Sequence, residues 1–355
     1  MVAFAHVCLC RCPRGVVVVV CLFGFIDFVV SPCGLEGPVR LVFLGSPEFV
    51  VPSLRALHAA GHEVALVVTR PDKPQGRSGA PMPTPVKEAA RALGLRVAQP
   101  RSVNSPRSLR DMRGAGARLG IVVAYGQILS PTALAATELG FLNLHASLLP
   151  DYRGAAPINW ALIRGEKVTG VSVVRMVPEL DAGPVLAQRH VAIGEDENAG
   201  TLEAHLSAVG AEALADVVNR LAAGEELPGL PQPAEGKCFA PKLTKEDGRV
   251  DWTLSADEIR NRVRGLTPWP GAYCDLAAGG RARRVVLLRT AACNELAATG
   301  AREPGTVLRG DAEGIVVQTG AGALRIAELK PAGGRAMSAA AFVNGYRVKP
   351  GDRFM

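Results

Sequence analysis

The fold follows from residues 39–68, VRLVFLGSPEFVVPSLRALHAAGHEVALVV. Residues 39–44 and residues 63–68 are short apolar runs of the kind that form buried β-strands. Between them, Ser46 can cap a helix whose first turn holds Pro47. A strand, a helix and a second strand within about 30 residues form a βαβ unit, which requires a parallel sheet. Because the G-x-G-x-x-G spacing is absent, this unit does not predict a dinucleotide site.

Segments of the same kind continue to about residue 224. Short apolar runs bounded by turn-forming residues predict strands, and apolar residues spaced by three or four predict helices. We expect strands at 119–124, 141–145, 170–177 and 185–193, and helices at 84–93, 156–164 and 199–224. This alternation places the chain in the α/β class, with a Rossmann-like, open and mostly parallel sheet.

The remainder of the chain has a different pattern. Residues 224–236 hold three prolines and three glycines, which is typical of a linker between domains. Beyond them, Ser255-Ala-Asp-Glu258 is a capping box that opens a helix ending near Gly265. Short β-like runs follow at 272–276, 283–289, 305–308, 314–319 and 323–329. Short strands separated by glycine predict a small, OB-like β-barrel.

We therefore divide the chain into four segments. They are an N-terminal extension (1–38), an α/β domain (39–224), a linker (225–239) and a C-terminal β-barrel domain (240–355). In the extension, Arg11 and Arg14 precede an apolar run at 16–30, as in a signal peptide. The run is shorter than the roughly 20 residues that a membrane span requires. We interpret the extension as dispensable or disordered, or as sequence upstream of the true start.

The cysteines predict neither a disulfide framework nor a metal site. Five of the eight fall in the extension, and the other three are scattered at Cys238, Cys274 and Cys293. No CxxC pair has a distal partner of the kind that zinc sites use. The body of the chain therefore fits a reducing compartment, and we expect a cytoplasmic protein that has no membrane partner and acts as a monomer.

The net charge of +7 lies entirely in the last third of the chain. Residues 236–355 contain 19 basic and 12 acidic residues, whereas residues 1–235 contain 21 of each. A neutral domain joined to a basic one suggests a reaction centre joined to a surface that binds a polyanion. A solvated basic surface explains the charge equally well. If the surface binds phosphates, Lys242, Lys245 and Arg249 are the expected contacts, because they follow the linker directly.

A long loop is expected at residues 69–85. It is rich in proline and glycine, and connections of this length are usually functional or disordered. It carries Arg70, Lys73 and Arg77, which are candidates for contact with a phosphate backbone.

Candidate reacting groups lie where the strand 141–145 ends. Asn143 and His145 alternate with leucines and therefore point to the same face, at the edge of the sheet where α/β proteins bind ligands. An amide and an imidazole together can polarise a carbonyl and move a proton. Asp181 lies on a second turn and can orient His145, although Asp followed by Gly is also a common turn former. No G-x-S-x-G elbow, P-loop or histidine-rich metal pattern is present.

Several motifs together resemble the methionyl-tRNA formyltransferases, within the folate-dependent formyltransferase superfamily. They are FLGSPEF (43–49), RPDKPQGR (70–77), VVAYG (122–126), NLHASLLPDYRGAAPI (143–158), LDAG (180–183), APKL (240–243), DW (251–252) and PWPG (268–271). The resemblance covers about residues 39–355. The Asn-x-His and Asp set marks the superfamily, and the basic loop with the C-terminal domain points to the enzymes that act on tRNA.

The resemblance implies an activity and a set of site residues. Such enzymes transfer a formyl group from 10-formyltetrahydrofolate, without a metal, to the α-amino group of methionine on initiator tRNA. Asn143, His145 and Asp181 match the catalytic trio: Asn143 and His145 stabilise the oxyanion, His145 takes the amine proton and Asp181 orients His145. The residues that match the folate-binding positions are Tyr125, Gly126, Ser147, Leu148, Leu149 and Pro150.

Two departures and three alternatives belong with this resemblance. The loop after Arg77 continues as Ser-Gly-Ala-Pro where the family has lysines, and residues 1–38 have no counterpart in the family pattern. A sugar-nucleotide N-formyltransferase or a formyltetrahydrofolate hydrolase shares the trio, but the basic C-terminal third argues against both. A non-catalytic nucleic-acid-binding protein leaves the trio unexplained.

Overall fold

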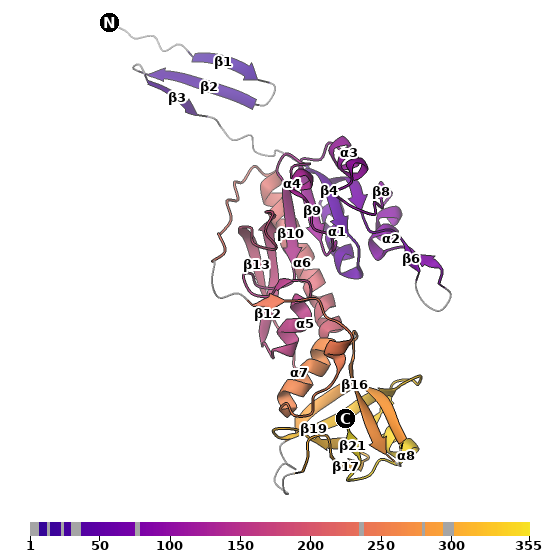
Figure 1. Cartoon of the computed structure of the whole chain (residues 1–355). Helices are drawn as coiled ribbons and strands as arrows, with labels where there is room; N and C mark the ends of the chain where they lie inside the picture. Colours follow the sequence, from indigo (N-terminus) through magenta and orange to yellow (C-terminus); the bar gives the residue numbers. More distant parts are fainter. Residues whose placement is uncertain are drawn as a thin grey trace.

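The computed structural model describes residues 7–12, 15–22, 25–29, 37–74, 79–233, 238–278, 281–293 and 302–355 (Figure 1). Near the N-terminus, β1 (Val7–Cys12), β2 (Gly15–Leu22) and β3 (Phe25–Val29) pair as an antiparallel sheet. The interpretation of residues 1–38 as an extension stays a prediction, since part of that segment lies outside the described residues.

The central sheet is open and mostly parallel, as predicted. Its seven strands run in the order β13-β12-β10-β9-β4-β5-β8. In chain order they are β4 (Arg40–Gly45), β5 (Glu63–Val68), β8 (Val97–Ala98), β9 (Leu119–Val123), β10 (Phe141–His145), β12 (Val168–Arg175) and β13 (Val185–Ala192). The five strands from β8 to β10 are parallel, and β12 and β13 add an antiparallel hairpin at one edge.

Helices cover both faces of this sheet (Figure 1). They are α1 (Val51–Ala59), α2 (Pro85–Ala92), α3 (Pro106–Gly114), α4 (Pro131–Leu134), α5 (Pro157–Ile163) and α6 (Ala199–Ala222). The core on one face joins α1 and α6 to the sheet, and a second core on the other face includes Met112 of α3 and Ala133 of α4. A Cβ on Gly210 of α6 would lie 2.8 Å from the Leu144 side chain, so α6 packs directly on β10. This packing fixes the strand that carries the candidate residues.

One local prediction is wrong: Ser46 does not cap α1. A short 3-10 helix, η1 (Glu48–Val50), comes between them, and no side chain caps α1. The Ser46 hydroxyl instead accepts hydrogen bonds from the Arg70 backbone N–H and from the Thr69 hydroxyl, both at 3.2 Å. Ser46 therefore ties the end of β4 to the end of β5.

The C-terminal sheet is antiparallel and barrel-like. Its strands run in the order β17 (Val307–Asp311), β18 (Gly314–Gln318), β19 (Ala323–Pro331), β16 (Arg281–Cys293), β15 (Ala272–Ala278) and β21 (Arg353–Phe354), and β20 (Met337–Ser338) pairs with β19. An antiparallel bridge between Thr306 and Arg353 joins the first and last strands. The predicted small barrel is confirmed.

Two helices pack on the barrel. The helix α7 (Ala256–Leu266) begins with the predicted capping box, in which Ser255 and Glu258 exchange hydrogen bonds. A helix that was not predicted, α8 (Ala339–Tyr346), buries Phe342 in the barrel core.

The barrel and the central sheet meet through α5 and α7. A Cβ on Gly265 would lie 2.6 Å from Ile163, so the two helices are in close contact. The Asn159 amide donates to the Gly265 carbonyl at 2.7 Å, and the Trp160 indole donates to the Pro241 carbonyl at 2.8 Å. Within the described part of the chain, no helix is both long and apolar enough to cross a membrane.

Candidate active site

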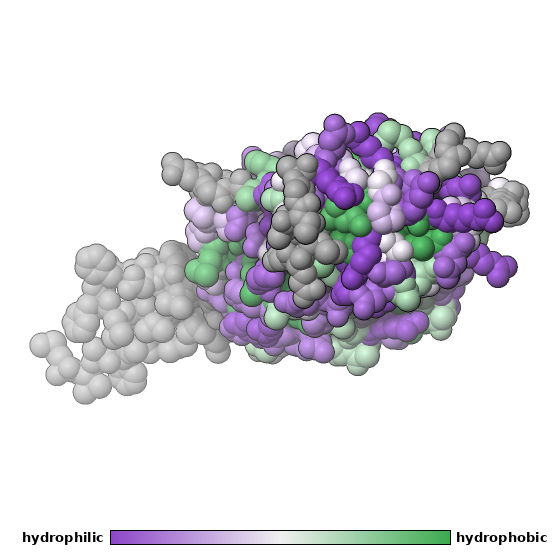
Figure 2. Space-filling view, turned by 90° about the horizontal axis from the view of Figure 1, so that it is seen from below, coloured by the Kyte–Doolittle hydropathy of each residue, from purple (hydrophilic) through white to green (hydrophobic). Residues whose placement is uncertain are grey.

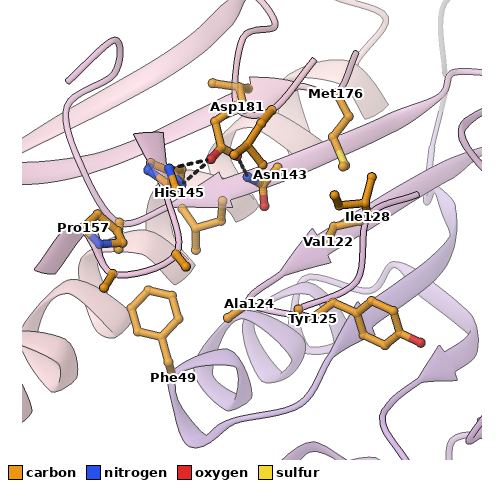
Figure 3. Close-up of a pocket in the computed structure, with 18 of the residues that line it drawn as sticks. Phe49, Val122, Ala124, Tyr125, Ile128, Asn143, His145, Pro157, Met176 and Asp181 are labelled. Atoms are coloured by element: carbon orange, nitrogen blue, oxygen red, sulfur yellow. Dashed lines mark hydrogen bonds and ion pairs between the residues drawn. The ribbon is translucent and has the colours of Figure 1, made fainter. Parts of the chain in front are cut away.

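The predicted trio comes together at the carboxyl end of β10 (Figure 3). Asn143 and His145 lie on the same strand and point toward Asp181, which lies in the loop between β12 and β13. The Asn143 amide donates to Asp181 Oδ1 at 3.3 Å, and His145 Nδ1 lies 3.8 Å from Asp181 Oδ2. The side chains of His145 and Asp181 are only 7% and 12% exposed, so little water screens their interaction.

The second nitrogen of the imidazole fixes its tautomer. His145 Nε2 lies 2.9 Å from the Tyr152 carbonyl, and a carbonyl can only accept a hydrogen bond. Nε2 therefore carries the proton, and in the neutral ring Nδ1 is the basic nitrogen. Since Nδ1 faces Asp181, His145 can take a proton there and the carboxylate can stabilise the cation that results.

The backbone around the trio is held in uncommon conformations. Asp181, Tyr152 and Ala124 have φ values of +49°, +59° and +42°, a region that non-glycine residues seldom adopt. Such conformations persist where the surroundings hold them, and they concentrate at functional sites. Here the Gly154 N–H donates to Asp181 Oδ2 at 3.1 Å, which ties the Tyr152 turn to the Asp181 loop.

The trio lines a cavity of about 670 Å³. Most of its wall is apolar and includes Phe49, Val122, Ile128 and Met176 (Figure 3). A largely apolar cavity with a few converging polar groups is the usual form of a small-molecule site, and this volume suits a ligand of drug size. Trp269 of the C-terminal half also lines the cavity and is exposed, so both halves of the chain contribute to the site.

The predicted folate-binding residues separate into two sets. Tyr125 and Gly126 line the cavity, whereas the turn of Ser147, Leu148, Leu149 and Pro150 is not among the described lining residues. The polar groups of that turn are bonded within the protein. The Ser147 hydroxyl donates to the Asp151 carbonyl, and Ser172 of β12 bonds to the backbone of Ser147 and Leu149. The turn therefore lies outside the described wall of the cavity. Its contact with folate stays a prediction.

Tyr125 is buried and its ring points away from the trio (Figure 3). Burial raises the pKa of its hydroxyl to about 12, although the nearby Arg70 lowers it. The hydroxyl has no hydrogen-bond partner among the described residues.

The predicted tRNA-binding residues also differ in their settings. Arg70 donates to the carbonyls of Tyr125 (3.1 Å) and Gly126, so it holds the cavity wall. Lys73 is exposed on β6 (Lys73–Pro74), which pairs with β7 (Pro81–Met82). Arg77 lies outside the described residues.

Lys242, Lys245 and Arg249 are exposed on the barrel side of the linker. Figure 2, which views the molecule from below, shows a surface that is mostly hydrophilic, with apolar residues toward its centre. None of these predicted tRNA contacts is tested by the structure.

Three contributors to the site were not predicted. They are the Tyr152 carbonyl, the Gly154 N–H and Gln232, whose amide donates to backbone carbonyls of the Asp181 loop. In the part of the chain that the structure describes, no three His, Cys, Asp or Glu side chains lie together as metal ligands would.

Comparisons with protein families cover both halves of the chain. Residues 39–218 match the model of the formyl transferase family, and residues 242–347 match the model of the formyl transferase C-terminal domain.

Named relatives match along most of their length. The methionyl-tRNA formyltransferase of Symbiobacterium thermophilum is 46% identical over 89% of this chain and 95% of its own. Those of Citrifermentans bemidjiense and Heliobacterium modesticaldum are each 44% identical, over 88% and 89% of this chain and 95% and 100% of their own.

Solved structures share the fold at low identity. HypX from Aquifex aeolicus in complex with tetrahydrofolic acid has a TM-score of 0.56 and 20% identity, over 87% of this chain and 47% of that chain. An N-formyltransferase from Helicobacter canadensis, in complex with folinic acid and dTDP-3-aminofucose, has a TM-score of 0.58 and 13% identity, over 81% of this chain and 98% of that chain. At these identities the likeness shows the fold alone.

Proposed function

This chain belongs to the formyl transferase family, and we propose that it transfers the formyl group of 10-formyltetrahydrofolate to the α-amino group of methionine on initiator tRNA. The observation that carries the proposal is the trio of Asn143, His145 and Asp181, which converges on one cavity in a chain that also has the family's C-terminal domain. The enzyme acts as a monomer in the cytoplasm, where translation supplies its acceptor.

The cavity has the properties that the donor requires. Its apolar wall, with Val122, Ile128 and Met176, suits a flat heteroaromatic group. When the folate is bound, it supplies the formyl carbon that the amine attacks. The polar trio lies at one side of that wall, where a reacting carbonyl can meet a hydrogen-bond donor and a base.

His145 moves the proton. As the amine attacks, a C–N bond forms to the formyl carbon and the amine loses one proton. Nδ1 is the nitrogen that accepts it, because Nε2 already donates to the Tyr152 carbonyl. Asp181, at 3.8 Å, stabilises the imidazolium. His145 then returns the proton to the departing nitrogen of the donor as the old C–N bond breaks, so protons and electrons balance.

Asn143 stabilises the charge that develops on the formyl oxygen. One N–H of its amide bonds to Asp181, which orients the group. Because Asn143 lines the cavity, its second N–H can donate to an oxyanion that forms there. A preorganised donor of this kind is typically worth about 3 kcal/mol in the transition state.

One assay tests the proposal against its alternatives. The protein is incubated with 10-formyltetrahydrofolate and methionyl initiator tRNA, with a 3-amino sugar nucleotide, or with no acceptor. We expect formylmethionyl-tRNA in the first reaction and no turnover in the others. Formylation of the sugar nucleotide would assign the chain to the sugar enzymes, and release of formate without acceptor would assign it to the hydrolases.

A further inference from the structure

The linker between the two halves directly contacts the loop that carries Asp181. Leu230 and Val185 exchange backbone hydrogen bonds at 2.8 Å, which places the linker against the start of β13. Two residues later, the Gln232 amide donates to the carbonyls of Asp181 at 2.8 Å and Gly183 at 2.7 Å. These bonds reach the backbone of the residue whose carboxylate faces His145.

The same side chain reaches the second segment of the site. Gln232 Oε1 accepts from Arg153 Nε at 3.1 Å and from the Nη2 of the same guanidinium. Arg153 is buried, and it lies between Tyr152, whose carbonyl accepts from His145, and Gly154, whose N–H donates to Asp181. Gln232 therefore joins the segment that holds His145 to the loop that carries Asp181.

The amide of Gln232 is fully used and can adopt only one orientation. Its two N–H groups meet two carbonyls, and its oxygen meets two guanidinium N–H groups. Turning the amide over would place oxygen against the carbonyls and N–H against Arg153, which loses all four bonds. A residue that only fills space in a linker does not need such a set of partners.

After Gln232, the linker contacts the site a second time. Its end forms β14 (Phe239–Ala240), which pairs in parallel with β11 (Arg153–Gly154). The Ala240 carbonyl also accepts from the backbone N–H of Ala155 at 2.8 Å. Gln232 and the end of the linker therefore hold the segments that place the trio, whereas Leu230, two residues before Gln232, contributes only its backbone and is 76% exposed.

We propose that Gln232 is a positioning residue, which holds the Asp181 loop so that the carboxylate faces His145 Nδ1. This inference rests on the proposed formyl transfer. It assigns a role in turnover to a segment whose evident role is to connect two domains. Since the reacting geometry tolerates little displacement, releasing the loop should slow the chemical step while the binding surfaces stay intact.

Two substitutions of Gln232 test the proposal. Gln232→Ala removes all four bonds. Gln232→Glu keeps the shape and the acceptors for Arg153 but cannot donate to Asp181 and Gly183, so it isolates the donation. We expect kcat to fall about 10- to 100-fold in both variants, with KM for the folate and for methionyl-tRNA within about twofold of wild type. The matched control is Leu230→Ala in the same linker, which should keep the wild-type kcat and both KM values.

Each other outcome has a distinct meaning. A wild-type kcat in Gln232→Glu would overturn the proposal, because donation to the Asp181 and Gly183 carbonyls would then not be needed to position the Asp181 loop. A raised KM for tRNA with unchanged kcat would also overturn it, since the linker would then only place the barrel. Equal melting temperatures and equal tetrahydrofolate binding across the variants establish that they fold. If wild type itself forms no formylmethionyl-tRNA, the proposed function fails, whereas unaffected Gln232 variants of an active enzyme refute this inference alone.

Discussion

At the carboxyl end of β10, polar side chains are buried and bonded to one another, whereas the charged residues of the C-terminal sheet stand on the surface. The His145 side chain is 7% exposed and Arg153 is 6% exposed, and each has a specific partner. In the C-terminal sheet, Arg284 pairs with Asp275 and Arg289 with Glu328, and both arginines are more than half exposed.

The two regions use charge in different ways. A buried, bonded group has one geometry and a strong local field, which chemistry requires. Exposed ion pairs are worth at most about 1 kcal/mol each. The excess of 19 basic over 12 acidic residues in 236–355, however, produces a positive field that attracts a polyanion over a distance. Changes at the first region should therefore alter kcat, and changes at the second should alter the binding of tRNA.

The largest effect is expected from His145→Ala. Loss of a positioned base typically costs between about 100- and 10,000-fold, so we expect kcat to fall about 1,000-fold while tRNA binding changes less than twofold. Steady-state formylation and a filter-binding assay measure the two quantities. The control is His190→Ala on β13, an exposed histidine, which should leave both unchanged. A fully active His145→Ala would remove this residue from the mechanism.

A somewhat smaller effect is expected from Asn143→Ala. The substitution removes a donor to the developing oxyanion, so kcat should fall about 100-fold, with little change in the folate KM. Initial rates over a range of folate concentrations separate the two constants. A raised KM with unchanged kcat would show instead that Asn143 binds the donor in its ground state.

For the exposed lysines Lys242 and Lys245, the comparison predicts a change in tRNA binding rather than in kcat. The double variant Lys242→Glu, Lys245→Glu should raise the tRNA KM about 10-fold at low salt, with a smaller effect as salt rises, because phosphate contacts release counterions. Folate KM and kcat should not change. The matched control is Arg335→Glu, Lys349→Glu, which reverses two exposed charges elsewhere in the same half of the chain. If both pairs raise KM equally, net charge rather than a local contact is responsible.

The smallest effect concerns stability in the catalytic half. Burial lowers the pKa of His62 from 6.5, although its bond to Asn219 raises it. The unfolded chain therefore takes up the proton first, so stability is complete above pH 6.5 and falls as the pH drops from there toward the folded pKa. The neutral ring accepts from the Val39 N–H, which a protonated ring cannot do. Urea unfolding from about pH 7.5 to about pH 5.5 should show a weaker pH dependence in His62→Gln. If the free energy of unfolding depended on pH equally in both proteins, His62 would not be the source of the pH dependence.

Sequence patterns predicted the parts of the molecule that depend on side-chain type. The apolar runs of β4, β5, β9 and β10 are strands, and the alternation in β10 places Asn143 and His145 together. The helix α3 escaped prediction because its nine residues include only two large apolar side chains, Leu109 and Met112, which are too few to mark a helical period in the sequence.

Contacts made by the backbone could not be predicted in this way. Tyr152 and Gly154 act through a carbonyl and an N–H, which every such residue carries. Gln232 bonds to carbonyls 51 and 49 residues earlier in the chain, and no side-chain pattern marks that meeting. Ser46 is a residue type that often caps helices, but once β4 and β5 pair, its hydroxyl accepts hydrogen bonds from the Thr69 hydroxyl and the Arg70 N–H instead.

The division between the two regions can be tested directly by single-turnover formylation, with methionyl-tRNA binding measured in the same samples. Wild type, His145→Ala and the variant Lys242→Glu, Lys245→Glu are compared at saturating tRNA and then at low tRNA. We predict that His145→Ala binds tRNA normally but transfers slowly at both concentrations, and that the lysine variant transfers at the wild-type rate when tRNA saturates and slowly when it does not. Slow transfer by the lysine variant at saturating tRNA, or weak tRNA binding by His145→Ala, would contradict the account.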